Sequence, residues 1–118
     1  MQVLRSPASK SEAQGQAGFG MANLRRNRTG LPFIVFISQK DEARHAARVK
    51  VSPEPRVRSD EMSSYSISPF EWKDGPRLSN SEEKLLGRWI GTNARVLLDY
   101  WNGAIEYTED AIGQLKAI

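Results

Sequence analysis

The alternation of apolar and polar residues predicts two adjacent strands in the first half of the chain. Apolar side chains occupy both faces of "PFIVFIS" (32–38), which is typical of a central strand or of one covered by a helix. In "HAARVKVS" (45–52) the residue types alternate, so Arg48 and Lys50 point to the face opposite Val49. The short polar link between the two segments predicts an antiparallel hairpin.

Further strand segments follow, each bounded by residues that break regular structure. "SSYSISPFEW" (63–72) predicts another strand, which Pro69 either ends or confines to an edge of the sheet. "RVR" (56–58) predicts a short edge piece, and "KDGPR" (73–77) has the composition of a turn. We therefore expect an antiparallel sheet of three to four strands.

The strongest helical pattern lies in "LSNSEEKLLGRWIGTNARVLLDYWNG" (78–103). Ser79 followed by Glu82 fits a capping box, and Gly103 is suited to end the helix in a left-handed conformation. Apolar and polar residues recur at three- and four-residue steps and form one stripe, namely Leu86, Trp89, Ile90, Asn93, Val96, Leu97, Tyr100 and Trp101.

Two glycines interrupt this helical pattern four residues apart, at Gly87 and Gly91. Each costs about 1 kcal/mol relative to Ala, which close approach of the helix to the sheet or to another chain would offset. The alternative is a break near Gly91 that divides the segment into two helices. A short helix capped by Thr108 is predicted at the end, with Ile112 and Leu115 inward.

These elements predict an α+β fold in which a small antiparallel sheet is packed by a long C-terminal helix, with a short terminal helix beside it. We expect a single domain over residues 31–118. Residues 1–30 are rich in Ser, Ala, Gln, Gly and Arg without apolar periodicity, so we expect a disordered basic N-terminal arm.

Composition narrows the class of protein. The chain of 118 residues has no cysteine, which excludes disulfides and thiolate metal sites. No apolar run approaches the ~20 residues of a membrane helix, so we expect a cytoplasmic protein without a membrane partner. Residues 1–60 hold eleven Lys and Arg against five Asp and Glu, a balance of +6, whereas residues 61–118 have a balance of −3.

Candidate catalytic chemistry is sparse. His45 is the only histidine, and a general base needs an orienting partner for which only Asp41 and Glu42 are near in sequence. The chain has no phosphate-binding glycine loop, serine elbow or zinc-ligand spacing, so we expect no metal and no cofactor. A small hydrolase or nuclease centred on His45 stays an alternative, and an enzyme is the less favoured class.

The basic residues suggest a nucleic-acid-binding module as an alternative function, because clustered cations neutralise phosphates. Aromatic residues that could stack on bases are not interleaved with them. The candidate nucleic-acid-binding residues are Arg25, Arg26 and Arg28 on the arm, Arg48 and Lys50 on the predicted strand, and Arg56 and Arg58 beyond it.

Large aromatic residues suggest binding to a protein partner or a second copy of the chain, since Trp and Tyr dominate interface energetics. Trp89 is best assigned to the core. The candidate partner-binding residues are Trp72, Tyr100 and Trp101.

The segments "RHAARVKVS", "YSIS" and "RWIGTNARVLLDYWNGAIEYTEDAIGQLKAI" resemble small uncharacterised bacterial and prophage proteins of the domain of unknown function family 4160. The resemblance covers residues 31–118 and rests on the helix features Trp89, Asn93, Leu97, Leu98 and Trp101 and on the "LKAI" ending. This chain has Ala94 directly after Asn93 and lacks the family's paired histidines. The resemblance implies a non-enzymatic bacterial or phage interaction protein that binds a macromolecular partner, with a component of a toxin–antitoxin-like pair as one form.

Overall fold

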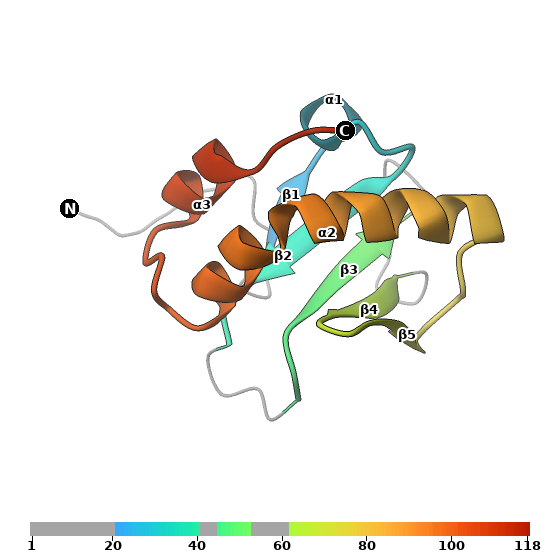
Figure 1. Ribbon diagram of the computed structural model, residues 1–118, viewed down its shortest axis with the longest axis horizontal. Coiled ribbons are helices and arrows are strands. Elements are labelled where there is room, and N and C mark those ends of the chain that lie inside the picture. The colour runs from blue at the N-terminus through green and yellow to red at the C-terminus, as the bar shows by residue number, and fades with distance from the viewer. Residues whose placement is uncertain (1–20, 41–44, 53–61) are drawn as a thin grey trace.

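The computed structural model describes residues 21–40, 45–52 and 62–118, which form an α+β fold (Figure 1). One antiparallel sheet has its strands in sequence order, so each strand pairs with the one before it. The strands are β1 (Met21–Leu24), β2 (Ile34–Ser38), β3 (Arg48–Ser52), β4 (Ser63–Ile67) and β5 (Phe70–Asp74). The predicted hairpin is confirmed as β2 and β3, with Val35 opposite Val51.

The described residues form a sheet of five strands rather than the predicted three to four. The predicted segment 63–72 contains the whole of β4 and the start of β5, because the chain reverses at the cis Ser68–Pro69 peptide. Pro69 therefore lies in the turn where β4 ends, as one of the two predicted alternatives had it, and the sheet continues with β5. The predicted edge piece 56–58 lies outside the described residues.

The other additional strand corrects our expectation that residues 1–30 form a disordered arm. Residues 21–30 belong to the domain: β1 pairs with β2, and the four-residue helix α1 (Arg26–Thr29) follows. Ala22 and Leu24 are buried against the core, so only two apolar side chains on one face anchor this strand. Residues 1–20 lie outside the described part of the chain.

The long helix α2 (Asn80–Trp101) is confirmed, including its capping box. The Ser79 hydroxyl accepts a hydrogen bond from Glu82 N, and the Glu82 carboxylate accepts one from Ser79 N at 3.0 Å. The helix is continuous, so the break considered near Gly91 is absent. Gly103 follows with φ +84°, as predicted.

The two glycines inside α2 differ in their surroundings. A Cβ added at Gly87 would lie 3.2 Å from the Phe70 ring, so this glycine permits the close approach of helix and sheet. A Cβ at Gly91 would meet nothing within 4 Å. Contact with the sheet therefore explains Gly87 and not Gly91.

The second helix of the C-terminal region, α3 (Thr108–Gln114), begins at Thr108, the residue predicted to be its cap, and therefore one residue earlier than expected. Its N-cap is Tyr107, and Thr108 instead accepts or donates a 2.6 Å hydrogen bond with the Tyr100 hydroxyl. Leu115 is buried and Ile112 partly buried, which agrees with the prediction that both face inward.

Helix α2 covers one face of the sheet and divides it into a core face and an outer face. The core face includes Val35 and Val51, which lie directly opposite each other, and Tyr65, which lies on the same side of β4. The outer face carries the intervening positions, including Lys50 opposite both Phe36 and Ser64. Side chains on this outer face are therefore separated from α2 by the sheet itself.

Candidate functional site

The outer face of the sheet presents the two cations predicted on the second strand. Lys50 is exposed and Arg48 is half-buried, and the register places them beside Ser64 and Ser66 of β4. Both serines are buried, although neither belongs to the apolar core. The prediction that Arg48 and Lys50 point away from the helix is confirmed.

The arm arginines are fixed to the domain rather than carried on an unstructured leader. Arg26 and Arg28 lie on α1, and Arg25 is its N-cap residue. All three are exposed, and the Arg28 guanidinium donates a hydrogen bond to the carbonyl of Ile112 at 2.5 Å. The structure thus places Arg28 beside α3, and all three arginines lie on elements separate from the strand that carries Arg48.

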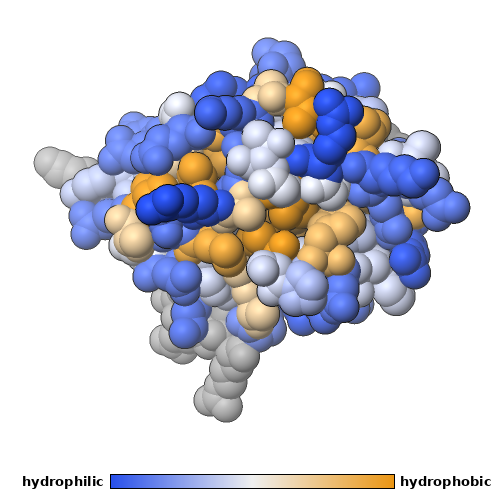
Figure 2. Space-filling model, viewed as in Figure 1, coloured by the Kyte–Doolittle hydropathy of each residue, from blue (hydrophilic) through white to orange (hydrophobic). Residues whose placement is uncertain are grey.

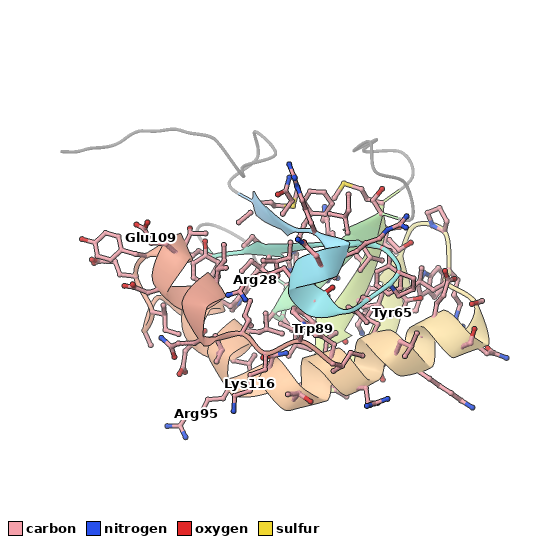
Figure 3. The ribbon with its side chains drawn as sticks, turned by 90° about the horizontal axis from the view of Figure 1, so that it is seen from above. Arg28, Tyr65, Trp89, Arg95, Glu109 and Lys116 are labelled. Atoms are coloured by element: carbon pink, nitrogen blue, oxygen red, sulfur yellow. The ribbon has the colours of Figure 1, made fainter. Side chains whose placement is uncertain are left out.

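A further group of cations lies on the outward face of α2, and the sequence reasoning did not select them. Lys84, Arg88 and Arg95 are exposed and follow the side of the helix opposite its buried stripe. Figure 3 shows Arg95 extending from α2 away from the sheet. Their spacing of four and seven residues repeats the helical period, and this signal was available in the sequence.

The C-terminal segment 115–118 joins α1 to α2 and adds one more cation. Lys116 N donates to Asn93 Oδ1 at 2.7 Å, and Ile118 N donates to the carbonyl of Thr29 at 2.9 Å. The exposed Lys116 therefore lies between the two helices (Figure 3). We call the seven cations on these elements the basic surface: Arg25, Arg26, Arg28, Lys84, Arg88, Arg95 and Lys116.

Few acids balance this surface in the described part of the chain. The only described ion pair that involves it joins Arg95 to Asp99 at 4.0 Å, at the limit of such a contact, and the Arg95 side chain is almost fully exposed. Three acids gather instead around an open hollow of about 450 Å³ beside α3, where Glu106, Glu109 and Asp110 line it. On the face that carries α2, hydrophilic side chains surround apolar patches (Figure 2).

Hydrogen bonding fixes the turn before α2 through Tyr65, Glu83 and Arg77. The Tyr65 hydroxyl donates to Glu83 Oε2 at 2.6 Å and accepts from Leu78 N at 3.0 Å, while Arg77 Nε donates to the same carboxylate oxygen at 2.8 Å. Burial and the neighbouring carboxylate raise the pKa of Tyr65 to about 12, and the Arg77 and Tyr65 hydrogen bonds lower the pKa of Glu83. Each donor has an acceptor, so the cluster is a structural brace.

His45 is exposed at the surface, before β3 begins. Its Nδ1 lies 2.8 Å from the carbonyl of Ala46, and its ring centroid is 5.4 Å from that of Trp101. The neighbouring acids Asp41 and Glu42 lie outside the described residues. Within the described residues no cluster of three or more His, Cys, Asp or Glu side chains could hold a metal ion.

The three aromatic partner candidates have different surroundings. Trp72 on β5 is 41% exposed, its Nε1 donates to the carbonyl of Gly75 at 3.1 Å, and the Arg77 guanidinium lies 5.6 Å from its ring centroid. Tyr100 and Trp101 are 3% and 6% exposed and belong to the core. Their assignment as partner anchors is therefore wrong for this chain on its own, because the buried stripe of α2 extends to its last turn.

The candidate nucleic-acid-binding residues thus divide into separate surfaces. Arg48 and Lys50 lie on the outer face of the sheet, while Arg25, Arg26 and Arg28 lie beside the C-terminal segment. Arg56 and Arg58 lie outside the described residues. In the described part of the chain, no helix combines the length and apolar character needed to span a bilayer.

Comparison of the chain with known protein families, with curated proteins and with solved structures finds no match in any of the three. The resemblance to the domain of unknown function family 4160 therefore stays a prediction.

Proposed function

We propose that this protein is a non-enzymatic nucleic-acid-binding module that contacts the phosphate backbone through the basic surface. The observation that carries the proposal is that seven exposed cations lie on or next to α1, on α2 and on the C-terminal segment 115–118, which is hydrogen-bonded to both helices. Clusters of Lys and Arg bind polyanions because each phosphate contact releases condensed counterions. The macromolecular partner expected from the sequence is, on this proposal, DNA or RNA.

The geometry of α2 supports contact with a phosphate backbone. Arg88 and Arg95 are seven residues apart, so they project from the helix about 10 Å from each other. Between them, Gly91 and Thr92 are exposed and small, and the space above Gly91 is open. A sugar-phosphate chain can therefore approach the helix axis closely while the flanking guanidinium groups reach its phosphates.

The proposal predicts sequence-tolerant, salt-sensitive binding. No exposed aromatic residue lies among the cations of the basic surface in the described chain, so base stacking contributes little. The acids beside α3 would repel a polyanion and restrict it to the side of Lys116 and Arg95. Affinity should then depend on salt concentration and only weakly on sequence.

The test measures binding of labelled random-sequence duplex DNA and single-stranded RNA of equal length by fluorescence anisotropy across a salt series. For the duplex, the slope of log affinity against log salt should be about −0.9 for each neutralised phosphate, and Arg88→Gln with Arg95→Gln should reduce its magnitude by about 2. Binding that does not respond to salt, or no binding at low salt, would overturn the proposal.

A matched control removes two charges from the opposite side of the sheet. Arg48→Gln with Lys50→Gln changes the net charge by the same amount but leaves the basic surface intact. We expect this variant to keep most of the affinity. If it loses as much as the α2 variant, the contact is non-specific attraction by net charge; if it loses more, the outer face of the sheet is the interface.

A protein partner, including a toxin–antitoxin-like arrangement, is the second candidate function. One observation favours it: Trp72 is a large aromatic side chain held in an exposed position on an edge strand. Co-purification of a protein that Trp72→Ala releases would support it. No described contact of His45 favours a hydrolase or nuclease.

A further inference from the structure

We infer that β5 is a self-association edge, through which two copies of the chain join their sheets about a two-fold axis centred on Trp72. The inference does not rest on nucleic-acid binding. It starts from the position of β5 at the end of the strand order, where only one of its two edges pairs with another described strand.

The exposure of β5 sets it apart from the other described strands. Four of its five residues are exposed and Phe70 is half-buried, whereas β1 at the opposite end of the sheet is mostly buried. Within the described residues, no backbone hydrogen bond joins the outer edge of β5 to a segment outside the sheet. An unpaired strand edge is a ready template for an added strand.

The sequence of β5 is self-complementary in one register. In an antiparallel pair, directly opposite residues point to the same face of the sheet. A two-fold axis that relates two paired copies of β5 must therefore place one residue of the strand opposite the same residue of the second copy. Centring on Trp72 places Glu71 opposite Lys73 of the second copy, and Lys73 opposite its Glu71. Centring on Glu71 or on Lys73 instead places like charges opposite each other, which disfavours pairing.

The side chains of β5 are already arranged for this register. The register between β4 and β5 shifts at Tyr65, so Lys73 is an extra residue with no direct partner on β4. Its side chain forms an ion pair with Glu71 at 2.9 Å in the single chain, and both charges can exchange partners across the axis. Trp72 is oriented by its hydrogen bond to Gly75 and by Arg77 over its ring. The two indoles would meet at the axis, where an aromatic pair contributes most to a small interface.

Two-fold symmetry makes the contact closed, so the assembly stops at a dimer. The axis is perpendicular to the shared sheet, and both copies of α2 therefore pack on the same face of that sheet. The partner is thus a second copy of this chain and not a growing fibre of strands.

The experiment measures molar mass of the full chain by sedimentation equilibrium over a wide concentration range. The wild type should show a monomer–dimer equilibrium, and Glu71→Lys or Lys73→Glu alone should weaken dimerisation at least tenfold by placing like charges opposite each other. A wild type that stays monomeric throughout would overturn the inference. Circular dichroism checks that each variant is folded.

Two restorations separate this register from a general effect of charge. The double variant Glu71→Lys with Lys73→Glu keeps the complementary pairs and should dimerise like the wild type. An equal mixture of the two single variants should form a heterodimer, because one copy then presents two lysines to two glutamates. Failure of both restorations would overturn the register, and single variants that dimerise as tightly as the wild type would overturn the interface.

Discussion

Asn93 on α2 holds the backbone of Lys116 through two hydrogen bonds of opposite direction. Its Oδ1 accepts from Lys116 N at 2.7 Å, and its Nδ2 donates to the Lys116 carbonyl at 2.9 Å. The same Nδ2 also donates to the carbonyl of Trp89, and the side chain is 2% exposed. A buried polar residue within the apolar stripe of α2 thus fixes the segment that carries one cation of the basic surface.

Replacing Asn93 by Ala should destabilise the protein strongly. The change leaves two backbone groups of Lys116 without their partner and opens a small cavity, so we expect a loss of about 3 kcal/mol in the free energy of unfolding. Urea unfolding followed by circular dichroism measures it. The exposed neighbour Thr92 is the control, and Thr92→Ala should change stability by about 0.5 kcal/mol or less. Equal stability of the two variants would contradict the structural role of Asn93.

Tyr65 should make the protein less stable in alkali. Its pKa is raised to about 12 in the folded state from an ordinary value near 10, so its contribution is complete below pH 10 and is lost as the pH rises toward 12. Over this range the unfolded chain releases the phenolic proton first, which favours unfolding. Urea unfolding at a series of alkaline pH values measures the decline.

The variant Tyr65→Phe isolates this contribution. It should be less stable than the wild type at neutral pH by about 1–2 kcal/mol, because Leu78 N and Glu83 lose a hydrogen-bond partner. Its stability should then fall less steeply between pH 10 and 12. Some decline remains because burial also raises the pKa of Tyr100. An unchanged slope in Tyr65→Phe would contradict the assignment.

The two glycines of α2 should respond in opposite ways to alanine. At Gly91 the added methyl group enters open space, and the higher helix propensity of Ala should stabilise the fold by about 0.5–1 kcal/mol. At Gly87 it would lie 3.2 Å from the Phe70 ring, so the ring must move and the gain is reduced or reversed. Thermal unfolding of the two variants provides the comparison, and a stabilisation of Gly87→Ala equal to that of Gly91→Ala would show that Phe70 adapts freely.

The elements with two independent local signals could be predicted from sequence. Helix α2 combines a capping box at Ser79 with a long apolar stripe, and the hairpin of β2 and β3 combines apolar alternation with a short polar link. In both cases the local signals and the tertiary fold agree, which is why the sequence was sufficient to predict these elements.

The strands that were missed lack such agreement. Strand β1 has four residues beside an arginine-rich segment, and only pairing with β2 and burial of Ala22 and Leu24 make it a strand. Strand β5 alternates Phe70 and Trp72 with charged residues, but its first residues were assigned to the same predicted strand as β4, because nothing local shows that the chain reverses at Pro69. These are contributions of the tertiary structure, which single-sequence periodicity does not encode.

The candidate site could be predicted only in part for a similar reason. Counting charges identified the cations of the first half of the chain. Which cations share one surface depends on how segments that are distant in the sequence meet in the fold. The C-terminal segment joins the cations of α1 and α2, because Lys116 N donates to Asn93 on α2 and Ile118 N donates to the Thr29 carbonyl on α1. The burial of Trp101 likewise depends on packing at the last turn of α2.

The sequential order of the strands has a consequence for the kinetics of folding. Because every strand pairs with its predecessor, most of the sheet can assemble by successive hairpins with short loops to close. The hydrogen bond from Ile118 N to the Thr29 carbonyl joins segments that are far apart in the sequence, and it requires α1, α2 and the C-terminal segment to be in place. We expect the C-terminal segment to dock late, after the transition state, so that substitutions at its contacts accelerate unfolding and leave the refolding rate nearly unchanged.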